Sequence, residues 1–365
     1  MNQGSRRLGA SLLLLLATSV AYALGNPVSA ATTPSVARAM VPPPTSSATP
    51  PMGWNGYNEY HTYMTASMLE AEARALVSSG MKSAGYNYVI LDGGWALPWR
   101  NRFGEQQANP QRFPHGLQPV IQYVHSLGLR FGLYTSAGTE NCAHTSVGSY
   151  GHYATDAATF ARWGVDYLKF DWCYIPYGNY PSRTPMQVSQ LLARQMATAL
   201  AATHRRIVLD INDTLIKRDT PSAWAGGFGG LWRTTPDIQD NFASVVHNFQ
   251  LNERNLDHTH PGAWNDPDML EAGNSGLTTV ESQTQFTLWA EMAAPLIAGT
   301  NLTTMSPATS RVLLNRQVIA VDQDPLGIPG SIVARGQGTW VLTKPLVNHT
   351  QAIVLFNSTN APGCV

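Results

Sequence analysis

Lys169 and Asp171 stand two positions apart in a segment that is otherwise mostly apolar, Tyr167–Tyr174 (Tyr-Leu-Lys-Phe-Asp-Trp-Cys-Tyr). If this segment is a buried strand, residues two apart project to the same face, so the ammonium and the carboxylate lie together. Charged groups are costly in a dry interior unless they are paired or functional. A carboxylate kept ionised by a cation at the C-terminal end of a strand is a candidate nucleophile, and a structural salt bridge is the alternative.

Bulk composition narrows the class of partner. The chain has 365 residues, a formal net charge of zero and 13% charged residues, and it shows no basic stripe, which argues against nucleic acid as a partner. The sequence contains no His-Glu-x-x-His motif, no Gly-x-x-x-x-Gly-Lys motif and no Cys/His spacing typical of zinc sites. We therefore expect no metal and no nucleotide cofactor.

The N-terminus has the pattern of a secretory signal. Arg6 and Arg7 precede the apolar run Leu12–Leu24, and Val28-Ser29-Ala30 offers a cleavage site. The run is short for a membrane span, so a retained signal anchor is the less favoured alternative. We expect a signal peptide over 1–30, a Pro/Ser/Thr-rich linker over 31–50, and a secreted protein without membrane attachment after cleavage.

Residues 51–329 alternate short apolar runs with amphipathic stretches. Eight such units predict a (β/α)8 TIM barrel, and an open doubly wound sheet is disfavoured because no glycine-rich dinucleotide turn follows the first run. The predicted strands are Met52–Asn55, Tyr88–Asp92, Arg130–Thr135, Tyr167–Asp171, Arg206–Ile211, Leu231–Arg233, Ala263–Asn265 and Pro295–Ala298. The predicted helices include Ala66–Met81, Leu117–Leu127, Tyr153–Arg162 and Met186–Thr203.

Residues 330–365 change character. Gly338–Lys344 and Gln351–Asn357 read as two antiparallel strands, which are too few for an independent sheet. We expect the start of an antiparallel β domain that is incomplete, as in a truncated chain.

Polar residues recur where the predicted strands end, and TIM barrels build their active sites at that rim. Repeated carboxylates with one Lys, one Arg and many aromatics, but no metal or nucleotide motif, indicate a glycoside hydrolase, which needs one carboxylate as nucleophile and another as proton donor. The residues at these ends are Trp54, Asn55, Asp92, Tyr134, Lys169, Asp171, Asp210, Asn212, Arg233, Asp237, Asp266 and Asp268.

Two of these carboxylates suit the two roles. Asp171 fits the nucleophile because Lys169 favours its charged form. Asp237 fits the acid/base if a drier loop raises its pKa. Spacing alone does not separate Asp237 from three other acids, Asp240, Asp266 and Asp268.

Five segments resemble glycoside hydrolase family 27, the α-galactosidase family. Pro51–Asn58 (Pro-Met-Gly-Trp-Asn-Gly-Tyr-Asn) resembles its opening Pro-Met-Gly-Trp-Asn-Ser-Trp-Asn, Lys169–Cys173 its nucleophile strand, and Trp232–Ile238 its acid/base segment. Trp264–Leu270 and Ala293–Gly299 also match, so the similarity extends over nearly the whole predicted barrel.

The resemblance implies a barrel followed by an antiparallel β domain, and hydrolysis by double displacement with retention. It implies that Asp171 is the nucleophile and Asp237 the acid/base, and that Cys142 and Cys173 form a disulfide between the loops after the third and fourth strands. No cofactor is implied. The implied sugar-binding residues are Trp54, Asp92, Tyr134, Lys169, Arg233 and Met269.

Two positions depart from the family pattern. The family usually has Asp-Asp after the second strand, whereas this chain has Asp92 followed by Gly93. After the fifth strand Asn212 stands where a carboxylate receives the hydroxyl at carbon 2, with Asp210 and Asp213 as possible substitutes. A site that satisfies one hydroxyl fewer discriminates less for the sugar that carries it.

The leading expectation is therefore an exo-glycosidase for terminal α-D-galactosides. A β-L-arabinopyranosidase is the chemical alternative, because that sugar is galactose without the hydroxymethyl arm that the missing acid would hold. A catalytically silent carbohydrate-binding protein is the alternative from another class. The expected partner is a carbohydrate, a galactoside or an arabinopyranoside, and the sequence leaves the oligomeric state open.

Overall fold

The computed structural model describes residues 47–213, 222–359 and 361–364. The predicted signal peptide and all but the last four residues of the predicted linker lie outside these ranges. Within the described ranges, no helix combines the length and the apolar character that crossing a membrane requires.

Eight parallel strands form one sheet in the order β7-β6-β5-β4-β3-β2-β1-β8. Every predicted barrel strand is present with ends within two residues of the prediction, which confirms the (β/α)8 fold. The strands are β1 (Met52–Asn55), β2 (Tyr88–Leu91), β3 (Arg130–Ser136), β4 (Tyr167–Asp171), β5 (Val208–Asn212), β6 (Leu231–Arg233), β7 (Trp264–Asp266) and β8 (Leu296–Ala298).

The barrel is closed by the segment that follows β7. The Leu270 amide donates to the Ile297 carbonyl (2.8 Å), and the Gly299 amide donates to the Leu270 carbonyl (2.9 Å). These bonds join the last strand to the chain beyond β7, so the C-terminal ends of all eight strands share one rim.

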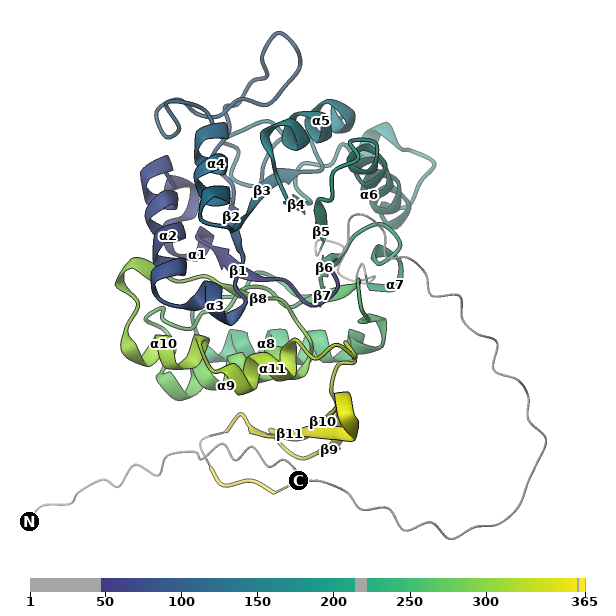
Figure 1. The fold of residues 1–365 in the computed structure, drawn as a ribbon. Helices are drawn as coiled ribbons and strands as arrows, with labels where there is room; N and C mark the ends of the chain where they lie inside the picture. The colour runs from purple at the N-terminus through teal and green to yellow at the C-terminus, as the bar shows by residue number, and fades with distance from the viewer. Residues whose placement is uncertain (1–46, 214–221, 360, 365) are drawn as a thin grey trace, which may run out of the picture.

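Helices surround the barrel (Figure 1). Two of them begin with a complete capping box, Thr184 with Gln187 and Thr278 with Glu281, which satisfies backbone amides at the helix start. The helices are α1 (Tyr57–Tyr60), α2 (Ala66–Ser78), α3 (Met81–Ala84), α4 (Gln118–Ser126), α5 (Tyr153–Trp163), α6 (Pro185–Ala201), α7 (Ser222–Ala225), α8 (Phe242–Asn252), α9 (Thr279–Glu291), α10 (Pro307–Leu313) and α11 (Arg316–Asp322).

Alternation along the strands separates two apolar clusters. On β4, Leu168 and Phe170 belong to the large cluster between sheet and helices, whereas Tyr167 belongs to the smaller cluster inside the barrel. Lys169 and Asp171 continue the inward face of Tyr167 toward the rim, because side chains two apart share a face. The barrel interior is thus apolar at depth and charged at its C-terminal mouth.

The C-terminal segment forms a three-stranded antiparallel sheet of β9 (Ser331–Arg335), β10 (Thr339–Leu346) and β11 (Thr350–Asn357). The two predicted antiparallel strands are confirmed as β10 and β11, but the prediction missed the third strand, β9. The sheet lies beside α8, α9 and α11 (Figure 1). Its Trp340 and Phe356 rings stack at 5.0 Å, and each meets Phe249 of α8 edge-on. This packing supplies the core that two isolated strands would lack.

Candidate active site

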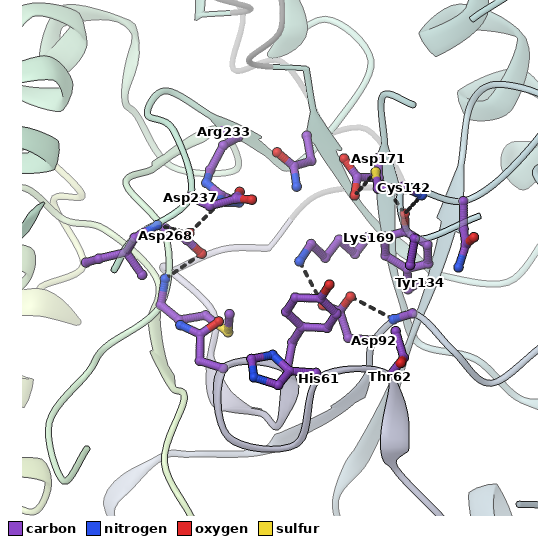
Figure 2. Close-up of a pocket in the computed structure, with 18 of the residues that line it drawn as sticks. His61, Thr62, Asp92, Tyr134, Cys142, Lys169, Asp171, Arg233, Asp237 and Asp268 are labelled. Carbon is purple, nitrogen blue, oxygen red and sulfur yellow. Dashed lines mark hydrogen bonds and ion pairs between the residues drawn. The ribbon is translucent and has the colours of Figure 1, made fainter. Parts of the chain in front are cut away.

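A pocket of about 420 Å³ opens at the C-terminal rim of the barrel. Residues on or just after seven of the eight strands line it, as Figure 2 shows for the central ones. Eight of the nine predicted catalytic and substrate-binding residues lie in this lining: Asp92, Tyr134, Lys169, Asp171, Asn212, Arg233, Asp237 and Met269.

Trp54 is the exception, and its prediction as a sugar-lining residue is wrong. It is fully buried in the outer cluster between sheet and helices, and its indole N–H donates to the Thr300 carbonyl (2.7 Å). Its neighbour Asn55 faces inward, so alternation turns Trp54 outward. Tyr57 lines the pocket instead. It occupies the second aromatic position of the opening motif, and that position was the signal in the sequence that could have identified it.

Asp92 is the centre of a buried polar network. Its Oδ2 accepts from Lys169 Nζ (2.7 Å) and from Asn55 Nδ2 (2.7 Å), and its Oδ1 accepts from the Gly93 amide (2.7 Å). Burial by itself would lower the pKa of Lys169, but the negative charge of Asp92 and further carboxylates raises it above its usual range. Lys169 therefore stays a cation in the pocket wall.

Asp171 is placed differently from the expectation. The ion pair of Lys169 is with Asp92 at the end of β2, two strands along the sheet, and Asp171 instead accepts from the Trp172 amide (2.8 Å). Desolvation raises the pKa of Asp171, while Lys169 and the Trp172 amide act against this shift. The prediction that Lys169 favours the charged form of Asp171 is therefore confirmed, but burial outweighs this effect, so the net shift raises the pKa.

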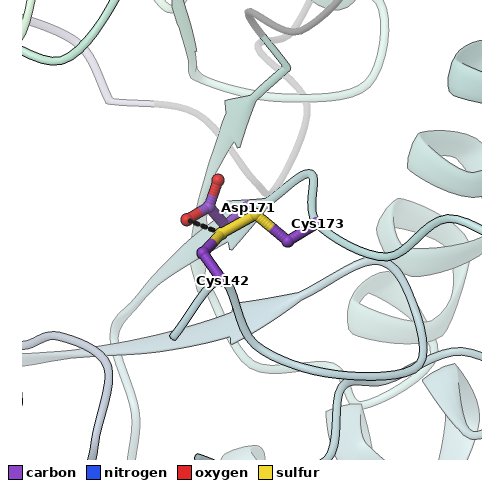
Figure 3. Close-up of side chains that lie close together, drawn as sticks. All are labelled: Cys142, Asp171 and Cys173. Atoms are coloured by element: carbon purple, nitrogen blue, oxygen red, sulfur yellow. Dashed lines mark hydrogen bonds between the residues drawn. A yellow bond between two sulfur atoms is a disulfide. The ribbon is translucent and has the colours of Figure 1, made fainter. Parts of the chain in front are cut away.

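The predicted disulfide between Cys142 and Cys173 is present and lies against Asp171 (Figure 3). Cys142 Sγ is 3.1 Å from Asp171 Oδ2. This is a sulfur–oxygen contact rather than a hydrogen bond, because a disulfide sulfur carries no proton. The two sulfurs and the carboxylate lie within 4.8 Å of one another. Disulfide sulfurs are not thiolates, so this group does not form a metal site.

Asp237 lies on the opposite side of the pocket with Arg233 and Asp268 (Figure 2). Its side chain is 81% exposed, and its Oδ1 accepts from Arg233 Nη2 at 2.6 Å. The positive charge of Arg233 lowers the pKa of Asp237 despite some desolvation. We expected the loop that carries Asp237 to be drier and to raise the pKa of this acid. The structure shows the opposite, an exposed carboxylate with a lowered pKa. Arg233 itself is buried and also binds Asp268.

The three acids that the sequence left as alternatives to Asp237 have distinct places. Asp268 and Asp240 line the pocket, and the Asp268 carboxylate also accepts from the Ile238 amide (2.8 Å). Asp266 is outside the lining and accepts from the Asp268 amide (2.8 Å). Asp268 thus organises the loop that carries Asp237 and does more than cap its own segment.

Asp210 and Asp213, which the sequence offered as substitutes at the fifth strand, are not in the pocket lining. Asp210 accepts from the Tyr167 hydroxyl (2.8 Å), deeper in the barrel, and burial raises its pKa to about 7. Asp213 is buried as well, and burial raises its pKa to about 7. Only Asn212 presents its side chain to the pocket from this strand.

Sequence reasoning missed Glu271 altogether. This buried residue lines the pocket, where its carboxylate accepts from Asn58 Nδ2 and from Asn274 Nδ2 (2.6 Å for Asn274). Burial raises its pKa to about 7. The only sequence signal was its place shortly after Asp268-Met269-Leu270, because it lies beyond the strand end itself.

Comparisons with known proteins agree on one family. Residues 49–324 match the family model described as "Alpha galactosidase A". A probable alpha-galactosidase of Dictyostelium discoideum is 41% identical over 87% of this chain and 80% of its own.

Solved structures point the same way. The crystal structure of alpha-galactosidase I from Mortierella vinacea has a TM-score of 0.81 and 33% identity, covering 85% of this chain and 82% of its own. The Saccharomyces cerevisiae α-galactosidase solved with raffinose has a TM-score of 0.80 and 30% identity, covering 85% and 74%.

Proposed function

Because this chain belongs to glycoside hydrolase family 27, the α-galactosidase family, and is therefore a glycoside hydrolase, we propose that it removes terminal α-D-galactosyl residues by double displacement. Asp171 is the nucleophile and Asp237 the acid/base. The single observation that carries this proposal is that the two carboxylates line the same pocket and lie on opposite sides of it (Figure 2). A sugar between them presents its anomeric carbon to one acid and its glycosidic oxygen to the other.

The first step forms a bond between an Asp171 oxygen and the anomeric carbon and breaks the bond to the leaving group, which takes the proton of Asp237. In the second step Asp237 removes a proton from water, and the resulting hydroxide displaces Asp171 from the other face. Two inversions give net retention. The Trp172 amide, which donates to Asp171, orients the nucleophile throughout.

The first catalytic step requires that Asp237 is protonated and that Asp171 is ionised. The charge of Asp237 raises the pKa of Asp171. A proton on Asp237 therefore removes this repulsion and makes ionised Asp171 easier to reach. A sugar that fills the pocket and excludes water from Asp237 would favour the protonated form of that acid.

Gly93 favours a second candidate, a β-L-arabinopyranosidase. A Cβ atom added at Gly93 would have no neighbour nearer than 3.8 Å, from Asn141 Nδ2 and Tyr134 Cε1. A Cβ atom would thus fit at Gly93 without a clash, and Gly93 lines the pocket beside Asp92, where a second carboxylate is missing. A hexose loses one hydroxyl partner there, whereas a pentopyranose lacks the hydroxymethyl group that would use it.

A comparison of two nitrophenyl glycosides tests both candidates. We expect the wild-type protein to hydrolyse the α-D-galactoside with release of the α-anomer of galactose, followed by NMR. In the Gly93→Asp variant, the ratio of kcat/KM for the galactoside to that for the β-L-arabinopyranoside should rise about tenfold, as expected for one added hydrogen-bonding partner.

Three other outcomes would overturn parts of the proposal. Wild-type activity on the pentoside alone would remove the galactosidase assignment in favour of the second candidate. Release of the inverted anomer would remove double displacement. Binding of galactose without turnover of either glycoside would establish the silent carbohydrate-binding protein instead.

We also propose that the protein is exported. Arg6, Arg7 and the apolar run Leu12–Leu24 support a signal peptide. The disulfide between Cys142 and Cys173 supports an oxidising compartment. N-terminal sequencing of protein recovered from the culture medium tests this, and a protein retained whole inside the cell would contradict it.

A further inference from the structure

The one-turn helix α1 forms part of the pocket wall but cannot hold itself in place. It comprises only Tyr57–Tyr60, and all four residues are exposed or partly exposed. A helix of this length is not stable by itself. Tyr57 and Asn58 nevertheless line the catalytic pocket, as do His61 and Thr62 directly after the helix (Figure 2). Contacts from other elements must therefore fix this part of the wall.

Side-chain contacts fix the two ends of α1. At its start, Asn55 Oδ1 accepts from the Tyr57 amide (3.0 Å). At its end, the Tyr60 hydroxyl donates to Glu72 Oε1 of α2 (2.5 Å). The side of the helix that carries Asn58 meets neither of these partners and needs a hold of its own.

Glu271 supplies this third hold from the loop after β7. Its Oε1 accepts from Asn58 Nδ2, and its Oε2 accepts from Asn274 Nδ2 (2.6 Å). The backbone of Glu271 is fixed on both sides, because its amide donates to Gln285 Oε1 of α9 (2.9 Å) and its carbonyl accepts from the Asn274 amide (3.0 Å). Glu271 is thus the rigid partner of the contact, and α1 is the element that it places.

The position of α1 matters to the chemistry through Tyr57. Lys169 Nζ lies 5.9 Å from the centre of the Tyr57 ring. Burial raises the pKa of Tyr57, and pocket carboxylates that include Asp171 and Asp237 act in the same direction. The Tyr57 side chain therefore lies within the electrostatic reach of both catalytic acids. A shift of α1 would move a wall of the sugar site.

We propose that Glu271 is a positioning residue for the glycosidase reaction, which holds Asn58 and thereby fixes Tyr57 in the wall of the sugar site. The inference rests on the proposed function, because it takes this pocket as the site of the terminal sugar. The two oxygens of Glu271 are occupied by Asn58 and Asn274, so Glu271 itself exchanges no proton with substrate. A wall that contacts the sugar equally in the ground state and the transition state affects KM rather than kcat.

Removal of either side of the contact tests the inference. For Glu271→Ala and for Asn58→Ala, we expect KM for the nitrophenyl glycoside that the wild type hydrolyses to rise about tenfold, the effect of one lost buried hydrogen bond, with kcat nearly unchanged. The double variant should be no worse than either single variant, because both changes break the same contact.

Two further variants separate positioning from charge and from general damage. Asn274→Ala removes the other bond of the same carboxylate, away from α1, and should keep the wild-type KM. Glu271→Gln should recover most of the loss seen in Glu271→Ala, since its amide can accept from Asn58 and donate to Asn274 once the Asn274 amide turns over. Circular dichroism checks that each variant folds, and if Glu271→Ala does not fold, Asn58→Ala and Glu271→Gln carry the test.

Three results would overturn the inference while the proposed function stands: a loss confined to kcat, additive losses in the double variant, or a Glu271→Gln variant as impaired as Glu271→Ala. If the wild type hydrolyses neither nitrophenyl glycoside, the proposed function fails, and calorimetric titration with galactose decides the inference. Binding about tenfold weaker in Asn58→Ala and retained in Glu271→Gln would support it, and unchanged or absent binding would overturn it.

Discussion

At the scale of single residues, Asp171 and Asp237 carry the same functional group in opposite surroundings. Desolvation raises the pKa of Asp171, whereas Arg233 lowers the pKa of the exposed Asp237. These directions are the reverse of what the proposed roles require in the free enzyme. The form with ionised Asp171 and protonated Asp237 is therefore a minor one until substrate binds, and pH controls its population.

The opposite pKa shifts of Asp171 and Asp237 predict a narrow pH profile of activity with an acidic optimum. For raffinose, kcat/KM should fall on both sides of the optimum, because the active form needs Asp171 ionised and Asp237 protonated, and its maximum should be low because Arg233 lowers the pKa of Asp237 and keeps that form minor. For an aryl galactoside with a good leaving group, the alkaline decline should be weaker, because that leaving group needs little protonation. Steady-state kinetics across the pH range with both substrates measures the difference.

Two variants check the assignment. Asp171→Ala should abolish turnover of every glycoside, and Asp237→Ala should reduce kcat/KM for raffinose roughly 10²–10⁴-fold, the usual contribution of general acid catalysis, and much less for the aryl galactoside. Equal losses on both substrates, or identical alkaline limbs in the wild type, would show that Asp237 is not the acid.

At the scale of elements, the loops after β3 and β4 are held as one unit beside the nucleophile. Cys142 and Cys173 join them, the Cys142 amide and Sγ each lie 3.3 Å from the Tyr134 hydroxyl, and Ser136 Oγ donates to the Cys173 carbonyl (2.9 Å). Gly138 is required at this junction, because a Cβ there would come within 2.0 Å of the Cys173 carbonyl oxygen. The disulfide therefore positions both Tyr134 and the chain that carries Asp171.

Breaking this link should weaken the enzyme in two ways. We expect the Cys142→Ser/Cys173→Ser double variant to lose on the order of 2–4 kcal/mol of unfolding free energy, since the bond closes a loop with a sequence separation of 31. We also expect kcat/KM to fall, because the pocket wall beside Asp171 loosens. Denaturant titration and steady-state kinetics with an aryl galactoside measure both effects.

A reducing agent gives an independent check. Dithiothreitol should lower wild-type activity and leave the double variant unaffected. The exposed free Cys364 provides the matched control, since Cys364→Ser should behave as the wild type. Full activity of the reduced wild type, verified by thiol counting, would mean that the disulfide does not position the nucleophile.

At the scale of the whole molecule, a buried cluster of ionisable side chains lies between the barrel helices and the C-terminal sheet. Lys344 of β10 is fully buried with Glu291 of α9 and Asp322 of α11, and its Nζ donates to the Ala290 carbonyl (2.8 Å). Burial raises the pKa of Glu291 to about 7 and that of Asp322 to about 8, and it lowers the pKa of Lys344. Gly330 leaves room for this group, since a Cβ there would lie 2.3 Å from Glu291 Oε1.

These shifts make stability depend on pH. An acid whose pKa is raised by folding binds more protons in the native state, so stability is greatest below the unfolded pKa and is lost as pH rises through the folded value. For Glu291 this window runs from about 4.3 to about 7. Lys344 acts oppositely, because its lowered pKa lets the unfolded chain bind more protons, in a window that reaches up to about 10.4.

We therefore expect the unfolding free energy to decline between about pH 5 and pH 7. Glu291→Gln should reduce that decline by about 1–3 kcal/mol, measured by urea titration at several pH values. The exposed Asp257 offers the control, because Asp257→Asn should retain the wild-type slope. An unchanged slope in Glu291→Gln would mean that Glu291 does not contribute to this decline.

The sequence by itself determined the barrel fold and the location of the active-site residues at the rim of the barrel. Short apolar runs and their regular spacing are local properties, so they located all eight strands within two residues, and the rim of a parallel barrel then gathered Asp92, Lys169, Asp171 and Arg233. The sequence did not reveal β9, because this strand has only five residues, Ser-Ile-Val-Ala-Arg, and its exposed and half-buried faces both carry apolar side chains.

Only the tertiary structure decided how these residues act on one another. It paired Lys169 with Asp92, 77 positions away, rather than with Asp171 two positions away. It turned Trp54 outward and Tyr57 inward, and through burial and the charge of Arg233 it raised the pKa of Asp171 and lowered the pKa of Asp237. Burial and charge–charge distances depend on how segments remote in the chain meet when the barrel closes, and no local pattern encodes them.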